Sequence, residues 1–369
     1  MRICFVARND FLSKPGGDTV QFEMYARAVE RAGWQALTWF EDGPRPEADV
    51  YHAFNIDRPL EIYPRLRKVK EANRPFVVST IHHPHEWMVR LRKTYPPAGL
   101  AGRLIYGSRL GESVAATETV KEVVRLAVQR RLGRVRDLFP GWSHRISWIL
   151  ANAARVFVLS KAETDALSTD FGFLQDDGRV VVLPNWVEGI EGRSAGMDRR
   201  GDDRGDAPVL VVGRIEARKN GLVVCHAARR VGRPVIFLGR PNPNESGYVA
   251  AFERAVKESG CVEWIRGVGR EELGNFYGQA SFLLNASLVE VSPLVDIEAL
   301  SFGCPVATTI YALHHEYLPE GTRRIDPYDV EEIIRILEWY PQPGEPINVV
   351  SADSCRQTLL QTYEIVRAG

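Results

Sequence analysis

The sequence predicts an α/β protein with two Rossmann-like domains, each built on a parallel sheet. Short apolar runs of strand type recur along the chain and alternate with helical or loop segments. Such alternation is typical of parallel strands that helices cover on both faces. The pattern stops at residues 189–207, which are rich in Gly, Arg and Asp, and then restarts. The length of 369 residues also exceeds the usual size of a single hydrophobic core.

These observations give the expected domain boundaries. The first Rossmann-like domain takes residues 1–188, with the strand-type runs "ICFVA", "ALTWF", "VYHAF", "FVVSTI", "VFVLS" and "VVVLP". Residues 189–207 form an exposed linker. The second domain takes residues 208–350, with "VLVVG", "VIFLG", "VEWIRG", "SFLLNA" and "PVATT". A final helix is expected over 351–369, after a proline-rich break, and packing back onto the first domain is one arrangement open to it.

Composition and charge favour a cytoplasmic globular protein. Hydrophobic residues make up 45% of the chain, and 47 lysines and arginines balance 47 aspartates and glutamates, so no global field indicates a nucleic-acid partner. The five cysteines form no C-x-x-C pair, which argues against a zinc site and against a disulfide framework. The apolar run at the N-terminus is too short for a signal peptide, and no stretch of about 18 apolar residues predicts a membrane span.

A glycine pair follows the first predicted strand. Gly16 and Gly17 precede an amphipathic run, and Asp18 with Gln21 three residues later has the spacing of a capping box. A helix is therefore expected to begin just after the two glycines.

A basic loop follows the first strand of the second domain. Arg214 and Lys219 lie five residues apart in "VGRIEARKN", just beyond the carboxyl end of the strand, where open α/β sheets bind ligands. A guanidinium grips phosphate through two N–H groups and an ammonium adds a point charge, so the pair suits a diphosphate. The alternative is a solvated basic turn without function.

Two glutamates flank a predicted helix start in "EVSPLVDIEALSFGCPV". Ser292 before Pro293 predicts that the helix begins there, with free backbone N–H groups from Leu294 onward that form an anion site. Glu290 then precedes the helix and Glu298 lies on it. The alternative is that acidic residues near a helix N-terminus only complement its dipole, which contributes about 0.3–1 kcal/mol.

Together these motifs resemble family 4 glycosyltransferases, which have the GT-B fold. The resemblance rests on "PGGDTVQ", "FVLSKAE", "VLPNWVE", "VGRIEARKN" and the segment with both glutamates, in that order along most of the chain. It implies two Rossmann-like domains that face each other across a cleft, and a retaining transfer from a nucleoside-diphosphate sugar. It also implies that Glu290 addresses the transferred sugar, that Glu298 contacts the ribose hydroxyls, and that Arg214 and Lys219 hold the diphosphate.

The resemblance assigns further residues to the donor. Gly16 and Gly17 are expected to let backbone approach the donor, and the backbone near Ile265 and Arg266 is expected to meet the base. Many members have Gly-Phe-Gly after the first glutamate, but this chain has Val291, Ser292 and Pro293, so the backbone near the donor sugar is less free.

Three histidines follow a strand of the first domain. His82, His83 and His85 come directly after "FVVSTI", at the ligand-binding edge of the sheet. Only Glu86 lies near enough in sequence to complete a metal ligand set, and GT-B enzymes typically need no bound metal, so no metal or other cofactor is expected. His82 matches the histidine that similar enzymes place beside the reacting end of the donor sugar. The alternative is that these are surface loop histidines.

Residues 86–148 form a basic amphipathic segment with twelve lysines and arginines against five acidic residues, a surplus of seven positive charges. Apolar residues recur at helical spacing beside the arginines, and tryptophans flank the region: Val120, Val123, Val124, Ala127, Val128, Leu132 and Val135, with Trp87, Trp142 and Trp148. Such a segment lies either in the core or on an anionic membrane surface.

The sequence therefore predicts a retaining glycosyltransferase that moves a hexose or deoxyhexose from a nucleoside diphosphate to a glycan or lipid-linked acceptor, in cell-surface polysaccharide biosynthesis. The expected location is the cytoplasm, with peripheral contact to the inner face of the cytoplasmic membrane as an open question. Two alternatives remain. One is a GT-B nucleotide-sugar 2-epimerase, which converts its donor without an acceptor, and the other is an inactive nucleotide-binding scaffold.

Overall fold

The computed structural model describes residues 1–13, 16–41, 43–96, 108–128, 137–173, 178–188, 207–342 and 344–369. The chain forms two compact units. The first comprises Met1–Asn185 together with Ala352–Gly369, and the second comprises Trp186–Ser351. The C-terminal helix thus belongs to the first unit, while residues 189–206 of the expected linker lie outside the described residues.

The first unit contains a parallel six-stranded sheet in the order β2-β1-β3-β4-β5-β6. Its strands overlap the six predicted runs, each to within a residue at its start: β1 Arg2–Val6, β2 Gln35–Trp39, β3 Val50–Phe54, β4 Phe76–Ser79, β5 Arg155–Val158 and β6 Val180–Val182. The order reverses next to β1, which places the topological switch point of this sheet between β1 and β3.

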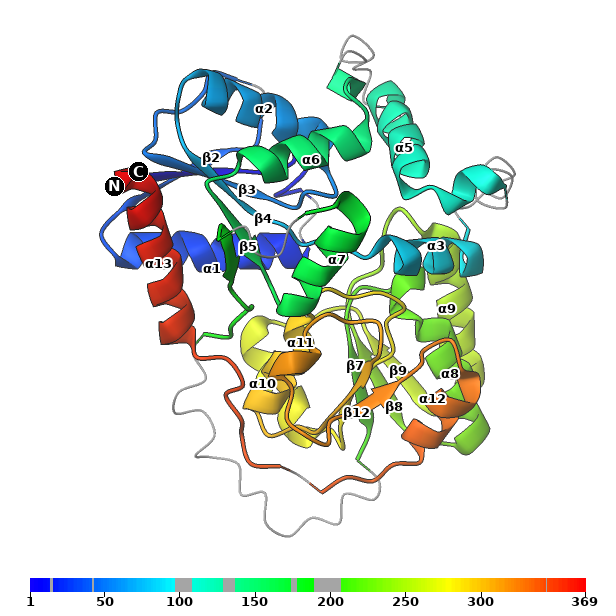
Figure 1. Cartoon of the computed structure of the whole chain (residues 1–369). Helices are drawn as coiled ribbons and strands as arrows, with labels where there is room; N and C mark the ends of the chain where they lie inside the picture. Colours follow the sequence, from blue (N-terminus) through cyan, green and yellow to red (C-terminus); the bar gives the residue numbers. More distant parts are fainter. Residues whose placement is uncertain are drawn as a thin grey trace. The chain divides into compact units, whose positions relative to one another are not determined.

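Helices cover both faces of this sheet (Figure 1). They are α1 Gly17–Arg31, α2 Pro59–Glu71, α3 His85–Thr94, α5 Val114–Val128, α6 Trp142–Asn152, α7 Lys161–Phe171 and α13 Ala352–Ala368, with a 3₁₀ turn at Arg109–Glu112. Strand β3 shows how its side chains alternate between the faces. Tyr51 and Ala53 join the core under α2 and α6, whereas His52 and Phe54 stack on the opposite face beside Tyr25 of α1.

The second unit contains a parallel six-stranded sheet in the order β12-β11-β10-β7-β8-β9. Its strands are β7 Val209–Val212, β8 Val235–Leu238, β9 Val262–Ile265, β10 Leu283–Asn285, β11 Val306–Thr309 and β12 Arg323–Ile325. Numbered within the unit, this is the Rossmann order 6-5-4-1-2-3. The predicted α/β fold with two parallel-sheet domains is therefore confirmed.

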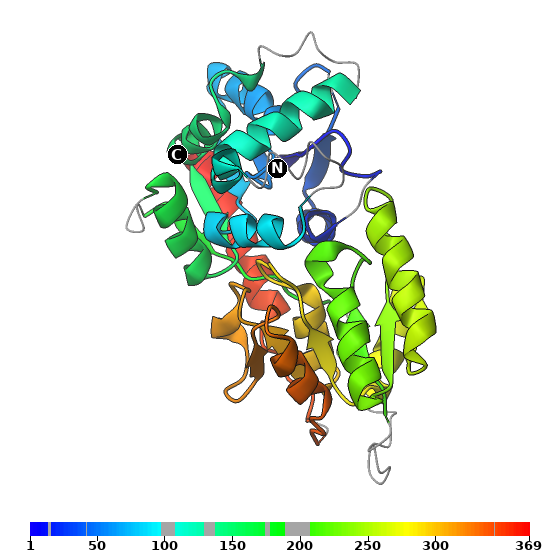
Figure 2. The same ribbon diagram turned by 90° about the vertical axis from the view of Figure 1, so that its right-hand side faces the viewer.

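Helices of the second unit divide between the two faces of its sheet. They are α8 Gly221–Val231, α9 Ser246–Ser259, α10 Arg270–Gln279, α11 Leu294–Ser301 and α12 Val330–Leu337, with 3₁₀ turns at Ala217–Lys219 and His315–Tyr317. Helices α8, α9 and α12 pack on one core, and α10 and α11 on the other. Figures 1 and 2 show α8 and α9 side by side. The switch point lies between β7 and β10, where Leu210 pairs with Leu283.

Two predicted helix starts are displaced by one residue. Helix α1 begins at Gly17, and the N–H of Gly16 donates to Thr19 Oγ1 at 3.1 Å. Asp18 lies inside the helix and accepts from Arg8 instead, so the predicted Asp18–Gln21 capping box is wrong. Helix α11 begins at Leu294 with Pro293 in the cap position and no side-chain cap, so Ser292 is not the N-cap.

The apolar stripe of the basic segment does not form core in the described residues. In α5, the exposed fractions of Val123, Val124 and Val128 are 41%, 54% and 77%, whereas the helix buries Val114 and Leu126. Helical periodicity correctly predicted an apolar face on α5, but it could not predict whether other residues bury that face.

Several cations of this segment form ion pairs with its own acidic residues. Arg145 is fully buried and contacts Glu122, and Arg92 contacts Glu118. Lys121 lies 2.8 Å from the same Glu118. Part of the positive surplus is therefore neutralised within the unit. No helix of the described residues combines the length and apolarity that crossing a bilayer requires.

A buried polar chain ties the C-terminal helix to the first sheet. His52 Nδ1 lies 2.6 Å from Tyr363 Oη, and His52 Nε2 lies 2.8 Å from Ser79 Oγ. Burial lowers the pKa of His52 to about 3, so the ring is neutral and one of its nitrogens accepts a hydrogen bond.

Replacing Tyr363 by Phe is expected to destabilise the first unit by about 1–3 kcal/mol, because it leaves a buried ring nitrogen of His52 without a partner. Native-state hydrogen exchange of the β3 amides measures this change. Tyr340→Phe is the control, since Tyr340 is 57% exposed and lies in the second unit. If the β3 amides exchange equally slowly in the wild type and in Tyr363→Phe, the hydrogen bond from Tyr363 to His52 does not stabilise the sheet.

Candidate functional site

The candidate site lies where β7 and β10 end, at the switch point of the second sheet. The loop after β7 carries Arg214 to Lys219, and the loop after β10 carries Ser287 to Pro293. Because the two strands are parallel neighbours, both loops leave the same edge of the sheet.

Close backbone approach positions the lysine. Lys219 ends the 3₁₀ turn Ala217–Lys219, and its stem lies against Gly213. A Cβ built on Gly213 would come within 3.1 Å of Lys219 Cε, and one built on Gly239 would come within 1.8 Å of the Gly213 carbonyl oxygen. The ends of β7 and β8 can approach this closely only because Gly239 has no side chain.

A buried carboxylate lies at the centre of the site. Glu290 is 7% exposed and forms ion pairs with Lys219 Nζ and, at 3.1 Å, with Arg218 Nη1. Its backbone N–H donates to the Tyr311 carbonyl at 2.8 Å. Burial alone would raise the pKa of Glu290, but Arg218 and Lys219 outweigh burial and hold the pKa well below its usual range. Glu290 is therefore ionised at neutral pH.

Arg218 is a site residue that sequence analysis missed. Its guanidinium spans two carboxylates, since Nε donates to Glu216 Oε1 at 3.1 Å while Nη1 faces Glu290. The same Nη1 donates to the Val289 carbonyl at 2.9 Å. The sequence placed three cations within six positions, but only the 3₁₀ turn decides which of them meets Glu290.

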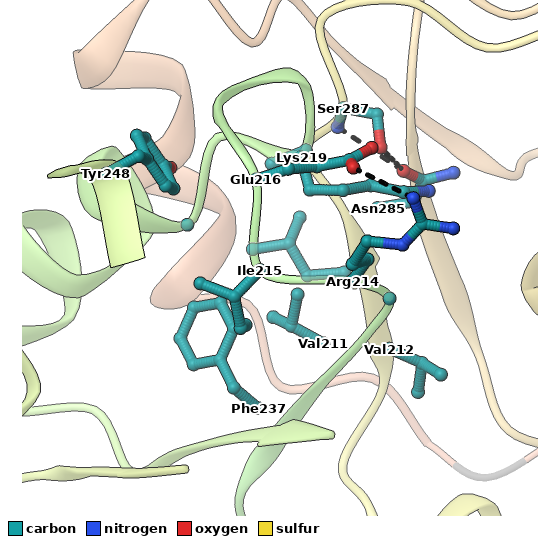
Figure 3. A pocket seen from close by; sticks show the side chains of 14 residues that line it. Val211, Val212, Arg214, Ile215, Glu216, Lys219, Phe237, Tyr248, Asn285 and Ser287 are labelled. Atoms are coloured by element: carbon teal, nitrogen blue, oxygen red, sulfur yellow. Dashed lines mark hydrogen bonds and ion pairs between the residues drawn. The ribbon is translucent and has the colours of Figure 1, made fainter. Parts of the chain in front are cut away.

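Arg214 completes the cationic loop. Its side chain is 39% exposed and lies 3.7 Å from Glu216 Oε2. Figure 3 shows Arg214, Glu216, Lys219, Asn285 and Ser287 on the polar side of a pocket. Val211, Ile215, Phe237 and Tyr248 contribute further lining. The site thus brings together three cations, Arg214, Arg218 and Lys219, and three carboxylates, Glu216, Glu245 and Glu290.

The second glutamate lies apart from this cluster. Glu298 is on α11 and accepts a hydrogen bond at 3.0 Å from the hydroxyl of buried Tyr277. Burial and the nearby Glu298 raise the pKa of Tyr277 well above its usual value, so Tyr277 remains a donor.

Asp296 fixes the first turn of α11. It is fully buried and accepts from Asn285 Nδ2 at 3.0 Å and from Thr308 Oγ1 at 2.6 Å. His314 Nε2 lies 3.1 Å from the same carboxylate. Asp296 therefore connects α11 to the ends of β10 and β11. It lies between Glu290 and Glu298 in the sequence, so these hydrogen bonds fix the segment that carries both glutamates.

The remaining expected donor residues of the second unit follow the backbone of these loops. Val291 is buried, and its carbonyl accepts from the Leu313 N–H at 2.9 Å. Ser292 and Leu294 are half-buried at the start of α11. Ile265 and Arg266 lie at the carboxyl end of β9, two strands away from β7. The Arg266 side chain contacts Glu253 and lies over the Trp264 ring.

Gly16, Gly17 and His82 belong to the first unit. A Cβ built on Gly17 would meet nothing within 4 Å, so packing in this unit does not require a glycine there. His82 is fully buried between two carboxylates, with Nδ1 2.7 Å from Asp57 and Nε2 2.8 Å from Asp170. Both ring nitrogens are engaged, which does not favour the expected direct contact of His82 with a sugar.

The histidine cluster is more complex than its sequence suggested. His82, His85 and Asp170 place one ligand atom each within 4.8 Å of one another, the one such group found in the described residues. The sequence offered only Glu86, but the fold supplies Asp170 from 85 positions beyond His85. The short contacts from His82 to Asp57 and Asp170 are those of hydrogen-bonded ion pairs.

His82 gives the first unit a pH dependence. Burial alone lowers the pKa of His82, but Asp57 and Asp170 outweigh burial and raise the pKa to about 10. Because the folded pKa exceeds the unfolded value, the stabilisation by His82 is fully present below about pH 6.5 and is lost as the pH rises through about 10.

His82→Gln is expected to lower the free energy of unfolding of the first unit by about 3–5 kcal/mol at pH 6, because two buried carboxylates lose their cation. The gap between wild type and variant should shrink as the pH approaches 10. Urea unfolding at pH 6, 8 and 10 measures it, and His144→Gln serves as the exposed control. If the difference in free energy of unfolding between wild type and His82→Gln stays constant with pH, His82 is not charged in the folded protein.

Comparisons with known proteins agree with this architecture. Residues 207–339, which contain the Lys219–Glu290 pair, match the family model described as glycosyl transferases group 1. The search of curated proteins yields no match.

Solved structures match the chain over nearly its whole length. Sucrose-phosphate synthase from Thermosynechococcus elongatus is 14% identical, with 100% of this chain and 96% of that chain covered and a TM-score of 0.63. Anabaena HepE in complex with UDP and glucose is 14% identical, with 99% and 94% covered and a TM-score of 0.58. WaaG, a glycosyltransferase involved in lipopolysaccharide biosynthesis, is 15% identical, with 100% of both chains covered and a TM-score of 0.56. Such distant likenesses show the fold, which is the predicted GT-B fold, and the group 1 match lies on its second domain.

Proposed function

We propose that this protein is a retaining glycosyltransferase, which transfers a hexose or deoxyhexose from a nucleoside diphosphate to a hydroxyl of a glycan or lipid-linked acceptor. The observation that carries the proposal is the cationic loop of Arg214, Arg218 and Lys219 around Glu290, at the switch point of a domain that matches group 1 glycosyltransferases. HepE binds UDP and glucose, and WaaG acts in lipopolysaccharide biosynthesis. These relatives support a nucleotide-sugar donor and a role in cell-surface polysaccharide biosynthesis.

The charges of the loop suit a diphosphate leaving group. The loop presents three cations at the ligand-binding edge of the sheet, and the side chain of Arg214 is 39% exposed, so an anion can reach it. Prearranged cations lower a barrier most where charge develops, and during transfer that is the departing diphosphate. Lys219 and Arg214 are proposed to hold its phosphates, while Arg218 keeps Glu290 ionised and in place.

The proposed reaction occurs on one face of the sugar. The bond between the anomeric carbon and the diphosphate oxygen breaks, and the acceptor hydroxyl oxygen forms the new bond from the same side. The acceptor proton passes to the leaving phosphate oxygen. Glu290 is proposed to accept hydrogen bonds from the sugar hydroxyls, and Glu298 from the ribose hydroxyls.

The first domain is proposed to contribute Gly16 and Gly17 as a backbone approach to the donor. His82 has both ring nitrogens engaged, so it is proposed to hold Asp57 and Asp170 in place rather than to contact the sugar. Val291, Ser292 and Leu294 are proposed to face the donor at the start of α11. Since the cationic loop can neutralise the diphosphate, the transfer is proposed to need no metal.

Lys219→Ala is expected to lower the transfer rate by about 10²–10³, because it removes a prearranged charge from the leaving group. Glu298→Ala is expected to abolish detectable transfer by removing the ribose contact. Product formation is measured with a donor selected from nucleotide sugars by thermal shift, since a ligand at 100 times its dissociation constant stabilises by about 2.7 kcal/mol. Lys257→Ala, exposed on α9, is the matched control.

Unchanged turnover in either folded variant would remove the basis of the proposal. Nuclear magnetic resonance of the product shows whether the anomeric configuration is retained, and chelator in a parallel assay tests the independence from metal. Conversion of the donor without an acceptor would indicate an epimerase, and binding of nucleotide without any conversion would indicate a scaffold.

The exposed face of α5 supports a peripheral membrane location for this enzyme. Val123, Val124 and Val128 present apolar surface next to a sequence with surplus positive charge, and Phe139 is 77% exposed. An apolar face combined with basic residues favours an anionic bilayer surface. We propose that this face contacts the membrane that carries a lipid-linked acceptor.

Replacing Val124 and Val128 by Asp is expected to weaken binding to vesicles of anionic phospholipid by about tenfold, because two exposed valines lose apolar contact. Co-sedimentation measures the bound fraction, with zwitterionic vesicles for comparison. Ile365→Asp is the control, since Ile365 is 56% exposed on α13. Equal loss in the control, or no wild-type binding to anionic vesicles, would contradict the membrane face.

A further inference from the structure

An arginine at the end of β8 lies between the cationic loop and the end of β9. Arg240 follows Gly239 directly after β8, and it is exposed. Its side chain makes no hydrogen bond or ion pair with any described residue. This distinguishes Arg240 from Arg218, which two carboxylates hold, and from Arg266, which contacts Glu253.

The backbone beneath Arg240 is fixed. The N–H of Ile215 donates to the Arg240 carbonyl at 2.9 Å, and the N–H of Asn242 donates back to the Ile215 carbonyl at 3.0 Å. Asn242 Nδ2 also donates to Glu216 Oε2 at 3.0 Å. The segment that carries Arg240 is thus bonded directly to the loop that carries Arg214 and Lys219.

The side chain of Arg240 extends toward the end of β9. A Cβ built on Gly267 would lie 3.6 Å from Arg240 Nε and 3.7 Å from its Cγ. The guanidinium therefore lies over the backbone that follows Ile265 and Arg266. On one side of Arg240 are the cations proposed for the diphosphate, and on the other is the strand end where the base is expected.

We infer that Arg240 contacts the base of the donor nucleotide and contributes to its selection. This inference rests on the proposed function and deepens it. A guanidinium has only hydrogen-bond donors, so it suits a base edge that presents a carbonyl oxygen. Uracil and guanine present such an oxygen where cytosine and adenine present an amino group. Arg240 thus selects nucleoside diphosphates with a carbonyl base over their amino counterparts.

Two matched ligand pairs test the inference on the full chain. UDP and CDP differ in the carbonyl or amino group at C4 of the pyrimidine; GDP and ADP differ in the same way at C6 of the purine, and guanine also carries a 2-amino group. Calorimetric titration gives the affinity ratio within each pair. The wild type should bind UDP more tightly than CDP, or GDP more tightly than ADP, by about tenfold or more. The reason is that the Arg240 guanidinium can donate a hydrogen bond to the carbonyl oxygen of UDP or GDP but not to the amino group of CDP or ADP.

Arg240→Ala is expected to bring that ratio close to one. Arg240→Lys keeps the charge but loses the planar fork, so it should retain most of the affinity while lowering the ratio. Arg229→Ala is the matched control, because Arg229 is exposed in the last turn of α8, at the end of the helix away from the loop. Its ratio should equal that of the wild type.

The outcomes separate the inference from the function on which it rests. An equal loss of affinity for all four nucleotides in Arg240→Ala would show a phosphate contact and overturn base selection. An unchanged ratio, a wild-type ratio near one, or a preference for CDP and ADP would overturn it as well. If the wild type binds none of the four nucleotides, the proposed function fails and the inference fails with it.

Discussion

The arrangement of the second unit depends on a buried carboxylate that two cations hold ionised. Glu290 is almost completely withdrawn from solvent, and an isolated charge there would be costly. Arg218 and Lys219 remove that cost, but only because a 3₁₀ turn after β7 presents both of them to the loop after β10. The Lys219 stem lies against Gly213, whose carbonyl oxygen closely approaches Gly239. The ionised state of Glu290 thus depends on the conformation of the loop after β7 and on how closely the ends of β7 and β8 approach each other.

Much of this architecture could be predicted from the sequence. The strands are short apolar runs with local signals, and the Arg214–Lys219 loop and Glu290 follow strand ends directly, so their common edge follows from parallel topology. Arg218 could not be singled out, because its partner Glu290 is 72 positions away. Asp170 was missed for the same reason, since it meets His82 across 88 positions. The α5 valines were ambiguous because periodicity locates an apolar face without identifying what covers it.

The two buried acid–base clusters use similar chemistry to different ends. In the first unit, one histidine cation lies between Asp57 and Asp170, so negative charge is in excess and both ring nitrogens are engaged. In the second unit, three cations lie among three carboxylates, and the side chain of Arg214 remains partly exposed. The first arrangement suits a fixed structural charge, and the second suits an anionic ligand. The exposure of a cation therefore distinguishes the two clusters more clearly than residue type does.

The Lys219–Glu290 pair also constrains how a donor can bind. A diphosphate that approaches Lys219 competes with Glu290 for the same ammonium, so binding would cost a buried ion pair unless another cation compensates. Arg218 supplies that compensation, because it contacts Glu290 independently of Lys219. Under the proposed function, Lys219 can turn toward phosphate while Glu290 stays ionised and becomes free to accept from sugar hydroxyls. Arg218, rather than Lys219, would then keep the carboxylate charged throughout the reaction.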